Sequence, residues 1–574
     1  MQSRMGLGWL FLAAVGCGSG GRVGQPVAQF PSKAKLEEVA ARPATPKSTL
    51  KTLTVDRWQM ETNVPAPGAT YPRENHWDEL LLSSLDGRSE VRASAELRCA
   101  AREAARFYVQ HGAYPDDSLR AFLLLRCGST APVGQIQTMF GDVPPGTTEA
   151  AIESGFDKSA KELIKQLSQA SELGLGFASA NGRATLVALS AKPPLRLNGF
   201  TPTIAGSSAV LQGEARDAGF VTGFVSNGGY GVKFCEPDRR LKMPAFRLEC
   251  PIAESDAEVT VELVTGKPNQ LFWHLAARAQ LRRDANAGLA YEGLAIGRNE
   301  TLSEPRAFGQ AFLAGLNQVR KEVGIPELGF EAAQSSTNER LLPHFFDNAF
   351  KGNEWMIEEI GLGLLAGWDV NGMIRTGGIF SSVSSSSRNP GRFLADALKS
   401  PFARWVLLEP EMTRVAIGAG ALEPSGAMAL ITTYAFFDSQ DHRADEAKVF
   451  QEFDKARRAH GVPPPRLVIK DGALLSALTQ VANNALPSDA ALQEAMRRIA
   501  QERSRGVSGY VFETSDLHHL EFPDELLRSN STEVQIGVTH YRARGGAWGQ
   551  YAVMFIFLEG GGPNTATAGT KAKL

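Results

Sequence analysis

The sequence has little cysteine, almost no net charge and only a short apolar run at its N-terminus. Five cysteines is an odd count, so they cannot all pair within the chain. A formal net charge of −2 gives no overall field that favours an anionic surface, and we expect no nucleic-acid partner. The N-terminal run, residues 7–15, is too short to span a bilayer as a helix.

Motifs of several common enzyme classes are also missing. The sequence has no G-x-S-x-G nucleophile elbow, no H-E-x-x-H metal helix, no C-x-x-C pair and no Walker-type phosphate loop. The serine run from Ser381 to Ser387 could supply a nucleophile, but nothing within it orients a base, and we interpret it as a flexible polar loop. We therefore expect no cofactor and no bound metal, and the sequence leans against an enzyme.

The first 17 residues have the features of an export signal. Arg4 gives a positive start, the apolar run follows, and Ala14-Val15-Gly16-Cys17 resembles the lipobox of bacterial lipoproteins, where leucine is usual in place of Ala14. The resemblance implies that Cys17 is acylated and begins a mature chain anchored to a membrane. Gly18, rather than an aspartate, favours the outer membrane. The alternative is an ordinary secretory signal with a chance cysteine.

Two segments have the composition of flexible chain. Residues 18–73 are rich in Gly, Pro, Ala, Ser, Thr and Lys, so we expect a tether that holds the folded part away from the membrane. Residues 561–574 are expected to be a disordered tail. The whole chain, with 43% apolar residues, is long enough for roughly three to five domains.

Residues 74–192 open with apolar residues at helical spacing and end with two apolar strands around a hairpin. Residues 193–295 differ, because short alternating runs between Gly, Pro, Asn and Asp clusters predict an antiparallel β-sandwich. Each segment holds two cysteines, and no histidine or further cysteine lies at metal-ligand spacing from the first two. For an exported chain we predict two disulfides, Cys99 with Cys127 and Cys235 with Cys250.

Residues 305–440 and 445–560 share one order of elements. Each begins with a helix-period run that stops at a glycine, Gly324 in one and Gly461 in the other, and proline follows. A second helix, a variable middle and two apolar strands around a hairpin come next. Because each copy is on the order of a hundred residues long, the repetition indicates duplicated domains, and residues 74–192 carry a fainter version.

Motifs in residues 305–440 resemble the CAP family (cysteine-rich secretory proteins, antigen 5 and pathogenesis-related-1). A helix with N-x-x-R before GIPEL, a segment SPFAR and the glycine strand VAIGAG are similar to the family's N-x-x-R, S-P-x-H-R and V-G-V-G elements. The resemblance implies an α+β protein of tandem CAP-like α-β-α sandwich domains with an inserted antiparallel β-sandwich. The residues that carry it are Asn317, Arg320, Ser400, Pro401, Arg404, Gly418 and Gly420.

The chain departs from the family where catalytic or metal chemistry would lie. Many CAP domains line a central cleft with two histidines and two glutamates, but Ala403 stands in place of the S-P-x-H-R histidine. His344, on an expected helix beside aromatic residues, is a weak catalytic candidate, with Glu339 or Glu354 as a partner acid. The adjacent histidines 518–519 are interpreted as surface loop residues.

Three functions remain open. The first is a lipid-anchored envelope protein without catalysis that binds lipid, cell-wall glycan or a protein partner through its CAP-like clefts and the sandwich. The second is an envelope hydrolase with a non-standard site. The third is a purely structural scaffold. We favour binding, because the family's histidines and glutamates are not assembled in the sequence and the domains repeat behind a membrane tether.

Overall fold

The computed structural model describes most of the chain from residue 12 to residue 558. The described ranges are 12–16, 30–46, 50–66, 68–167, 170–216, 218–267, 272–284, 288–385, 387–423, 425–437, 441–504, 506–515, 517 and 520–558. Cys17, His518, His519 and the tail 561–574 lie outside the described residues. The fold is mixed α and β with several small sheets, which confirms the expected α+β class at that level. None of the described helices is both long and apolar enough to cross a membrane.

One order of helices and strands recurs three times, in segments that we name unit one (residues 74–192), unit two (305–440) and unit three (445–560). A helix and a two-residue strand lead into further helices, a long strand, a variable stretch and a final hairpin. Unit one comprises α2 (His76–Leu85), β4 (Arg92–Ala93), α3 (Ala95–His111), β5 (Tyr114–Pro115), α4 (Asp117–Arg126), β6 (Val133–Asp142), α5 (Glu149–Gln166), β7 (Glu172–Ala180) and β8 (Arg183–Ala191). Unit two comprises α6 (Pro305–Glu322), β18 (Gly329–Phe330), α7 (Ala332–Lys351), α8 (Glu354–Ala366), β19 (Ile374–Ser384), α9 (Pro390–Ala397), α10 (Pro401–Leu407), β20 (Arg414–Leu422) and β21 (Gly426–Phe436). Unit three comprises α11 (Arg443–Ala459), β22 (Arg466–Leu467), α12 (Gly472–Ala482), α13 (Ser488–Arg503), β23 (Val507–Thr514), α14 (Asp524–Leu527), β24 (Glu533–Arg542) and β25 (Gly549–Leu558).

The strands of the three units pair in the same way. The two-residue strand runs parallel to the first hairpin strand. The two hairpin strands are antiparallel, and the remaining long strand pairs antiparallel with the second of them. The resulting orders are β4-β7-β8-β6, β18-β20-β21-β19 and β22-β24-β25-β23. The three segments therefore share one strand order.

Each of these sheets lies between two layers of helices. In unit two, α6, α9 and α10 cover one face and α7 and α8 cover the other. Successive residues of a strand face opposite sides, so Ala429 and Ile431 of β21 join the first core while Met428 and Leu430 join the second. Unit three repeats the layering, with α11 and α14 on one face and α12 and α13 on the other. In unit one, α2 and α5 lie opposite α3 and α4.

The segment between units one and two is a β-sandwich. One sheet has the order β13-β14-β10-β9, and the facing strands have the order β12-β11-β15-β16. Both predicted disulfides are present: Cys99–Cys127 joins α3 to the end of α4, and Cys235–Cys250 lies in the sandwich. The strands are β9 (Leu195–Leu197), β10 (Ser208–Ala215), β11 (Phe220–Asn227), β12 (Gly231–Phe234), β13 (Glu236–Pro237), β14 (Ala245–Pro251), β15 (Glu258–Gly266) and β16 (Phe272–Arg282).

A short strand from the predicted export signal, β1 (Leu12–Gly16), joins the sandwich to unit two. It pairs antiparallel with β16 at one end, where Leu12 lies opposite His274, and with β19 at the other, where Val15 lies opposite Gly378. The two sheets become one nine-stranded sheet through this strand. If the export signal is removed, as the sequence predicts, the strand goes with it.

Two predictions about flexible segments are wrong. Within the expected tether, residues 30–46 and 50–66 contain α1 (Lys33–Ala40), β2 (Thr52–Leu53) and β3 (Arg57–Gln59). The helix is held by unit two, β2 pairs with β5, and β3 pairs with β17 (Ala290–Glu292). The serine run is no loop in its first half, because Ser381 and Ser382 lie buried in β19 opposite β21.

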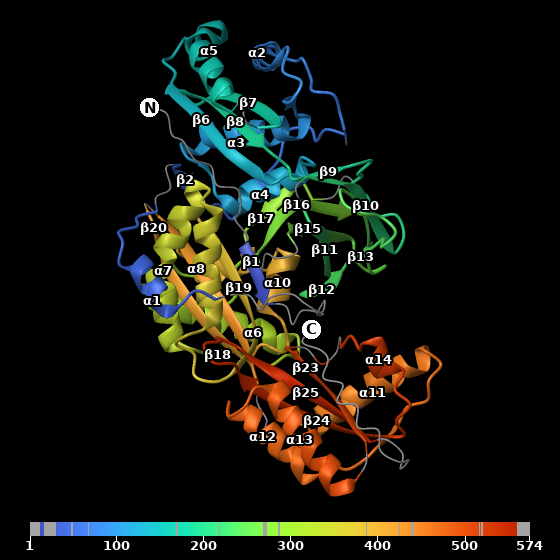
Figure 1. Ribbon diagram of the computed structural model, residues 1–574. Helices are drawn as coiled ribbons and strands as arrows, with labels where there is room; N and C mark the ends of the chain where they lie inside the picture. The colour runs from blue at the N-terminus through green and yellow to red at the C-terminus, as the bar shows by residue number, and fades with distance from the viewer. Residues whose placement is uncertain are drawn as a thin grey trace.

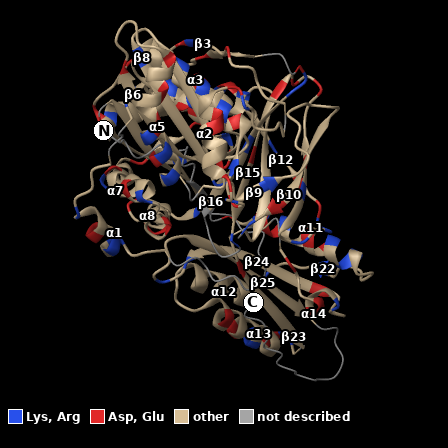
Figure 2. Cartoon of the chain, turned by 90° about the horizontal axis from the view of Figure 1, so that it is seen from above, with Lys and Arg blue, Asp and Glu red and all other residues tan. Residues whose placement is uncertain are grey.

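The units are arranged along the length of the molecule. Figure 1 shows unit one at one end, unit three at the other, and unit two with the sandwich beside it between them. Basic and acidic residues are interspersed along the elements in the view of Figure 2. Unit one contacts the N-terminal segment, the sandwich and unit two, and unit three contacts unit two.

Candidate functional site

The residues that resemble the CAP motifs are used for internal hydrogen bonds. Arg320, near the end of α6, is fully buried. Its Nε donates to the carbonyl oxygen of Pro326 at 2.6 Å, its Nη1 to that of Leu407 at 2.8 Å and its Nη2 to that of Met412 at 2.9 Å. Burial lowers the pKa of Arg320 to about 10. The guanidinium ties the end of α6 to the turn that follows it and to the chain between α10 and β20.

Asn317 pins the other side of the same turn. Its Nδ2 donates to the carbonyl oxygen of Leu328 at 3.1 Å, and the Leu328 amide donates to its Oδ1 at 2.8 Å. Unit three repeats the arginine contact, since Nε of the buried Arg457 donates to the carbonyl oxygen of Pro463 at 3.1 Å and its Nη2 to that of Ser529 at 2.9 Å. The residues of the N-x-x-R motif thus connect the helix to the turn that follows it, and they bring no reactive group to a surface.

The S-P-x-H-R segment joins unit two to the sandwich. Ser400 caps α10 by accepting from the Ala403 amide at 3.1 Å, and Pro401 occupies the first turn. The Ser400 hydroxyl also donates to Oε2 of Glu262 on β15 at 2.6 Å. Glu262 is fully buried and forms an ion pair with Arg278 of β16. A buried carboxylate from the sandwich therefore meets the start of a unit-two helix.

Arg404 strengthens the same joint. Its Nε donates to the carbonyl oxygen of Leu398 at 2.5 Å, and its Nη1 reaches the carbonyl oxygens of Gly229 and Gly231 in the sandwich at 3.3 and 3.4 Å. The guanidinium lies 5.7 Å from the ring centre of Tyr230. Burial lowers its pKa. Arg404 is thus a contact between two parts of the chain.

Gly418 and Gly420 allow α7 to approach β20 closely. A Cβ at Gly418 would lie 2.5 Å from the backbone carbonyl carbon of Asn338, and one at Gly420 would lie 2.6 Å from Leu342 Cδ2. Real side chains do not approach backbone atoms this closely. The glycine strand is therefore a packing feature of the helix–sheet contact.

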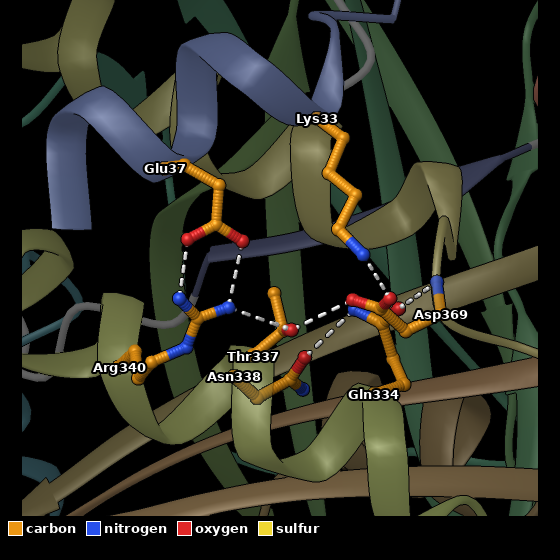
Figure 3. A network of polar contacts seen from close by, with 7 residues as sticks. All are labelled: Lys33, Glu37, Gln334, Thr337, Asn338, Arg340 and Asp369. Carbon is orange, nitrogen blue, oxygen red and sulfur yellow. Dashed lines mark hydrogen bonds and ion pairs between the residues drawn. The ribbon is translucent and has the colours of Figure 1, made fainter.

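Ion pairs and hydrogen bonds hold the N-terminal helix α1 against unit two, as Figure 3 shows. Lys33 forms an ion pair with Asp369, and Glu37 forms one with Arg340, whose Nη2 lies 2.8 Å from Glu37 Oε1. Thr337 Oγ1 donates to the second oxygen of Asp369 at 2.8 Å. Two charged residues of α1, Lys33 and Glu37, thus form ion pairs with unit two.

A line of hydrogen bonds runs from Asp369 through Gln334 to Asn338 (Figure 3) and continues into the sheet. The Asp369 amide donates to Gln334 Oε1 at 3.1 Å, and Gln334 Nε2 donates to Asn338 Oδ1 at 3.2 Å. Asn338 Nδ2 donates to Thr432 Oγ1 at 3.1 Å. The Tyr434 hydroxyl donates to the carbonyl oxygen of Leu364 at 2.7 Å and lies 2.9 Å from Thr432 Oγ1. These groups satisfy one another, so the network specifies how α1, α7 and the sheet fit together.

His344 is not part of an assembled catalytic group. It lies 7% exposed on α7 with the Ala40 backbone as a hydrogen-bond partner, and burial lowers its pKa. The charge of Glu354 acts on His274, and Glu339 has its pKa raised by burial and by a neighbouring glutamate. Neither acid is among the groups that shift the pKa of His344. The charged side chains that act on His344 are those of Asp347 and Arg42.

Sequence reasoning missed a polar joint around Ser118 at the start of α4. The Ser118 hydroxyl donates to Asp396 Oδ1 at 2.6 Å, while it accepts from the Tyr291 hydroxyl at 2.9 Å and from Lys399 Nζ at 3.1 Å. A serine, a lysine and an aspartate in contact could suggest a nucleophile. Both acceptor lone pairs of the Ser118 oxygen are already used, however, so none faces a substrate. The cluster joins unit one to unit two.

Asp116 and Asp117 extend this joint. Asp116 caps α4 by accepting from the Leu119 amide at 2.9 Å, and Asp117 accepts from the Ser385 amide of unit two at 2.6 Å. Burial, followed by the charges of Asp396 and Asp117, raises the pKa of Asp116 to about 6. The sequence showed the two aspartates as an adjacent pair, but it could not show that Asp396 lies beside them.

A second group missed by sequence reasoning is a histidine pair in unit three, His442 with His540, whose facing ring nitrogens are 3.0 Å apart. Among the described residues, no three or more histidine, cysteine or acidic side chains gather as metal ligands. An apolar cavity of about 70 Å³ lies where α3 and α4 meet β16, and its lining includes Ala104, Leu123, Ile136 and Leu275. That volume is well below the roughly 300 Å³ at which drug-sized ligand pockets begin.

Comparisons with known proteins give little. No protein-family model matches the sequence, and no curated protein matches it. Among solved structures, the chain is similar to an extracellular protein containing an SCP domain from Bacillus anthracis str. Ames, with 12% identity and a TM-score of 0.17 over 48% of this chain and 92% of that one. At that TM-score the likeness carries no argument about the function of this chain.

Proposed function

We propose that the chain is an exported lipoprotein of the bacterial envelope, built from three CAP-like units and a β-sandwich, that acts as a binding scaffold without catalysis. The sheet topology that recurs three times supports the tandem arrangement. The lipobox-like Cys17 and the two disulfides support an oxidising, extracytoplasmic location.

One observation carries the proposal. The residues that resemble the CAP motifs are used to join parts of the chain: Ser400 and Arg404 contact the sandwich, and Arg320 contacts the turn after α6. The Ser118 joint holds unit one to unit two in the same manner. Side chains held by buried partners keep the units in fixed positions, which suits a molecule that presents surfaces to lipid, cell-wall glycan or another envelope protein.

The test is native mass spectrometry of the full chain purified from bacterial membranes, beside a Cys17→Ala variant. We expect the wild-type chain to begin at an acylated Cys17, to sediment with membranes and to carry a lipid or glycan mass or a protein partner. The Cys17→Ala variant should leave the membrane fraction and keep the ligand.

Two results would count against the proposal in different ways. An unmodified Cys17 in a chain that retains residues 1–16 would overturn the lipid anchor. A chain free of adducts and partners in every fraction would overturn binding and leave the purely structural scaffold. Turnover of cell-wall fragments that is lost in a His344→Ala variant would instead support the envelope hydrolase.

A further inference from the structure

Two histidines meet at the start of unit three. His442 precedes α11 and is 9% exposed, and His540 lies on β24. His442 Nε2 and His540 Nδ1 are 3.0 Å apart, and the two rings are nearly perpendicular, at 80°. The other nitrogen of His442, Nδ1, lies 2.7 Å from Asp445 Oδ2.

The carboxylate of Asp445 decides the tautomer of His442. A carboxylate accepts hydrogen bonds, so the proton of a neutral His442 sits on Nδ1 and the Nε2 lone pair points towards His540. His540 Nδ1 either gives its own proton to that lone pair or directs a second lone pair into the same space. A histidine with one nitrogen held by a carboxylate and the other directed at a shared point is the arrangement found around metal-binding histidines.

Aromatic side chains surround His540. Phe437, at the end of unit two, stacks on His540 with ring centres 4.6 Å apart and planes at 12°, and Tyr551 lies edge-on to Phe437. Burial, then the charge of His442, lowers the pKa of His540. Glu446 is already used, because it forms an ion pair with Lys470 and accepts from a β24 amide.

We propose that His442 and His540 form a binding site for a divalent transition metal ion such as Zn²⁺, with Asp445 orienting the first histidine. Imidazole nitrogen is a suitable ligand for zinc, copper and nickel. At Zn–N distances of about 2.0–2.1 Å, two ligands of a tetrahedral ion stand about 3.3 Å apart, so the rings need to separate by only a few tenths of an ångström. Within the described residues no third protein ligand adjoins them, and water would complete the coordination.

Such an ion would act on the junction between units two and three. His442 lies five residues after Phe437, whose ring already rests on His540. Binding of both histidines to one ion would therefore hold the start of α11 against β24. It would also hold the His540 ring in the position on which Phe437 stacks. This inference does not depend on the lipid anchor or on the ligand of the proposed scaffold.

The experiment is isothermal titration of the full chain, without a polyhistidine tag, with ZnCl₂, together with thermal unfolding in the presence and absence of zinc. We expect one saturable site and a zinc-dependent rise in Tm. His442→Ala and His540→Gln should each abolish both effects, and Asp445→Asn should weaken binding roughly 10- to 100-fold. His460→Ala, which removes a histidine 39% exposed at the end of α11, is the matched control and should bind zinc like the wild type.

Each other outcome overturns the proposal. A wild-type chain that shows no saturable binding has no such site. If His442→Ala and His540→Gln are folded by circular dichroism and still bind like the wild type, the ion lies elsewhere. If the alanine variant fails to fold, the glutamine variant at His540 decides, because it retains hydrogen-bonding capacity without an imidazole.

Discussion

At the scale of single residues, the buried arginines Arg320 and Arg457 each stabilise the turn that follows a helix. Removing a guanidinium that donates to several carbonyl oxygens leaves those oxygens buried and unpaired, and each costs about 1–3 kcal/mol. The desolvation of Arg320 is the opposing effect, since burial lowers its pKa. We expect the hydrogen bonds to three carbonyl oxygens to outweigh it.

We predict that Arg320→Met destabilises unit two by at least about 2 kcal/mol, because the methionine fills part of the space but donates nothing. The matched control is Arg497→Met, which removes an exposed ion pair with Glu494 and should change stability by less than about 0.5 kcal/mol. Hydrogen exchange of the turn between α6 and β18 measures the local effect. Equal exchange in the two variants would show that the carbonyl contacts do not stabilise the turn.

The buried carboxyl of Asp116 makes the stability of the protein depend on pH. Burial raises its pKa in the folded protein to about 6, from an ordinary value of 3.8. Folding therefore favours the protonated form of Asp116. Its contribution to the free energy of unfolding is full below about pH 4 and is lost as the pH rises through about 6. The loss is at most on the order of 3 kcal/mol.

Asp116→Asn should remove this dependence, because asparagine keeps the cap of α4 without ionising. We expect the Tm of the variant to exceed that of the wild type at pH 8 and to approach it at pH 4.5, as measured by differential scanning fluorimetry. Other groups titrate in both proteins, so the difference between the two curves isolates Asp116. A difference that is constant with pH would contradict the raised pKa.

At the scale of elements, α1 shows where sequence reasoning stops. The helix spans eight residues, too short to be stable alone, and its buried residues are Leu36 and Val39. Its stability comes from α7 and α8, where Gly363 leaves room for Leu36: a Cβ on that glycine would lie 2.3 Å from the leucine Cδ2. No property of the local sequence reveals that receiving surface.

The distance along the chain between contacting residues also explains which other features could be predicted from the sequence and which could not. The cysteine pairs and the arginine that follows Asn317 are visible because their partners lie within a few tens of residues or follow a known motif. The serines at 381–382 were misread because their composition is polar, although small side chains fit a buried strand opposite β21. His442 and His540 are 98 residues apart, and only the fold brings them together.

We predict that Leu36→Ala releases α1, whereas Glu37→Ala does not. Leu36 is 2% exposed, so truncating it costs about 2–5 kcal/mol, while the ion pair of Glu37 is exposed and contributes about 0–1 kcal/mol. Limited proteolysis should cut residues 30–46 faster in the first variant only. Rapid cleavage in both would mean that the ion pairs, and not the apolar contacts, hold the helix.

The contact between α7 and β20 gives a further prediction at this scale. Gly418→Ala places a Cβ 2.5 Å from the backbone of Asn338, so α7 has to move, and we expect the Tm of unit two to fall clearly. Gly155→Ala is the control, because this glycine lies in α5 with no atom within 4 Å of its Cβ position and should gain up to about 1 kcal/mol. An unchanged Tm for Gly418→Ala would show that the helix shifts at no cost.

At the scale of the whole molecule, the sandwich and unit two share one core. Phe224 and Val264 of the sandwich belong to the same buried cluster as Phe402 of α10. Trp273 stacks on Trp405 with ring centres 5.4 Å apart and planes at 15°. The hydrogen bonds of Ser400 and Arg404 border this cluster, so apolar burial and polar contacts both resist separation of the two parts.

This shared core predicts what happens when residues 1–16 are removed. The strand β1 bridges β16 and β19 through five paired positions, whereas the described aromatic cluster joins the sandwich to α10 directly. We therefore expect a chain that begins at residue 17, with Cys17→Ser to avoid acylation, to keep the sandwich docked on unit two. By hydrogen exchange, the amides of β16 and β19 that face β1 should lose protection, while β15, β20 and β21 keep theirs. Loss of protection throughout both sheets would mean that β1, and not the aromatic cluster, holds the two parts together.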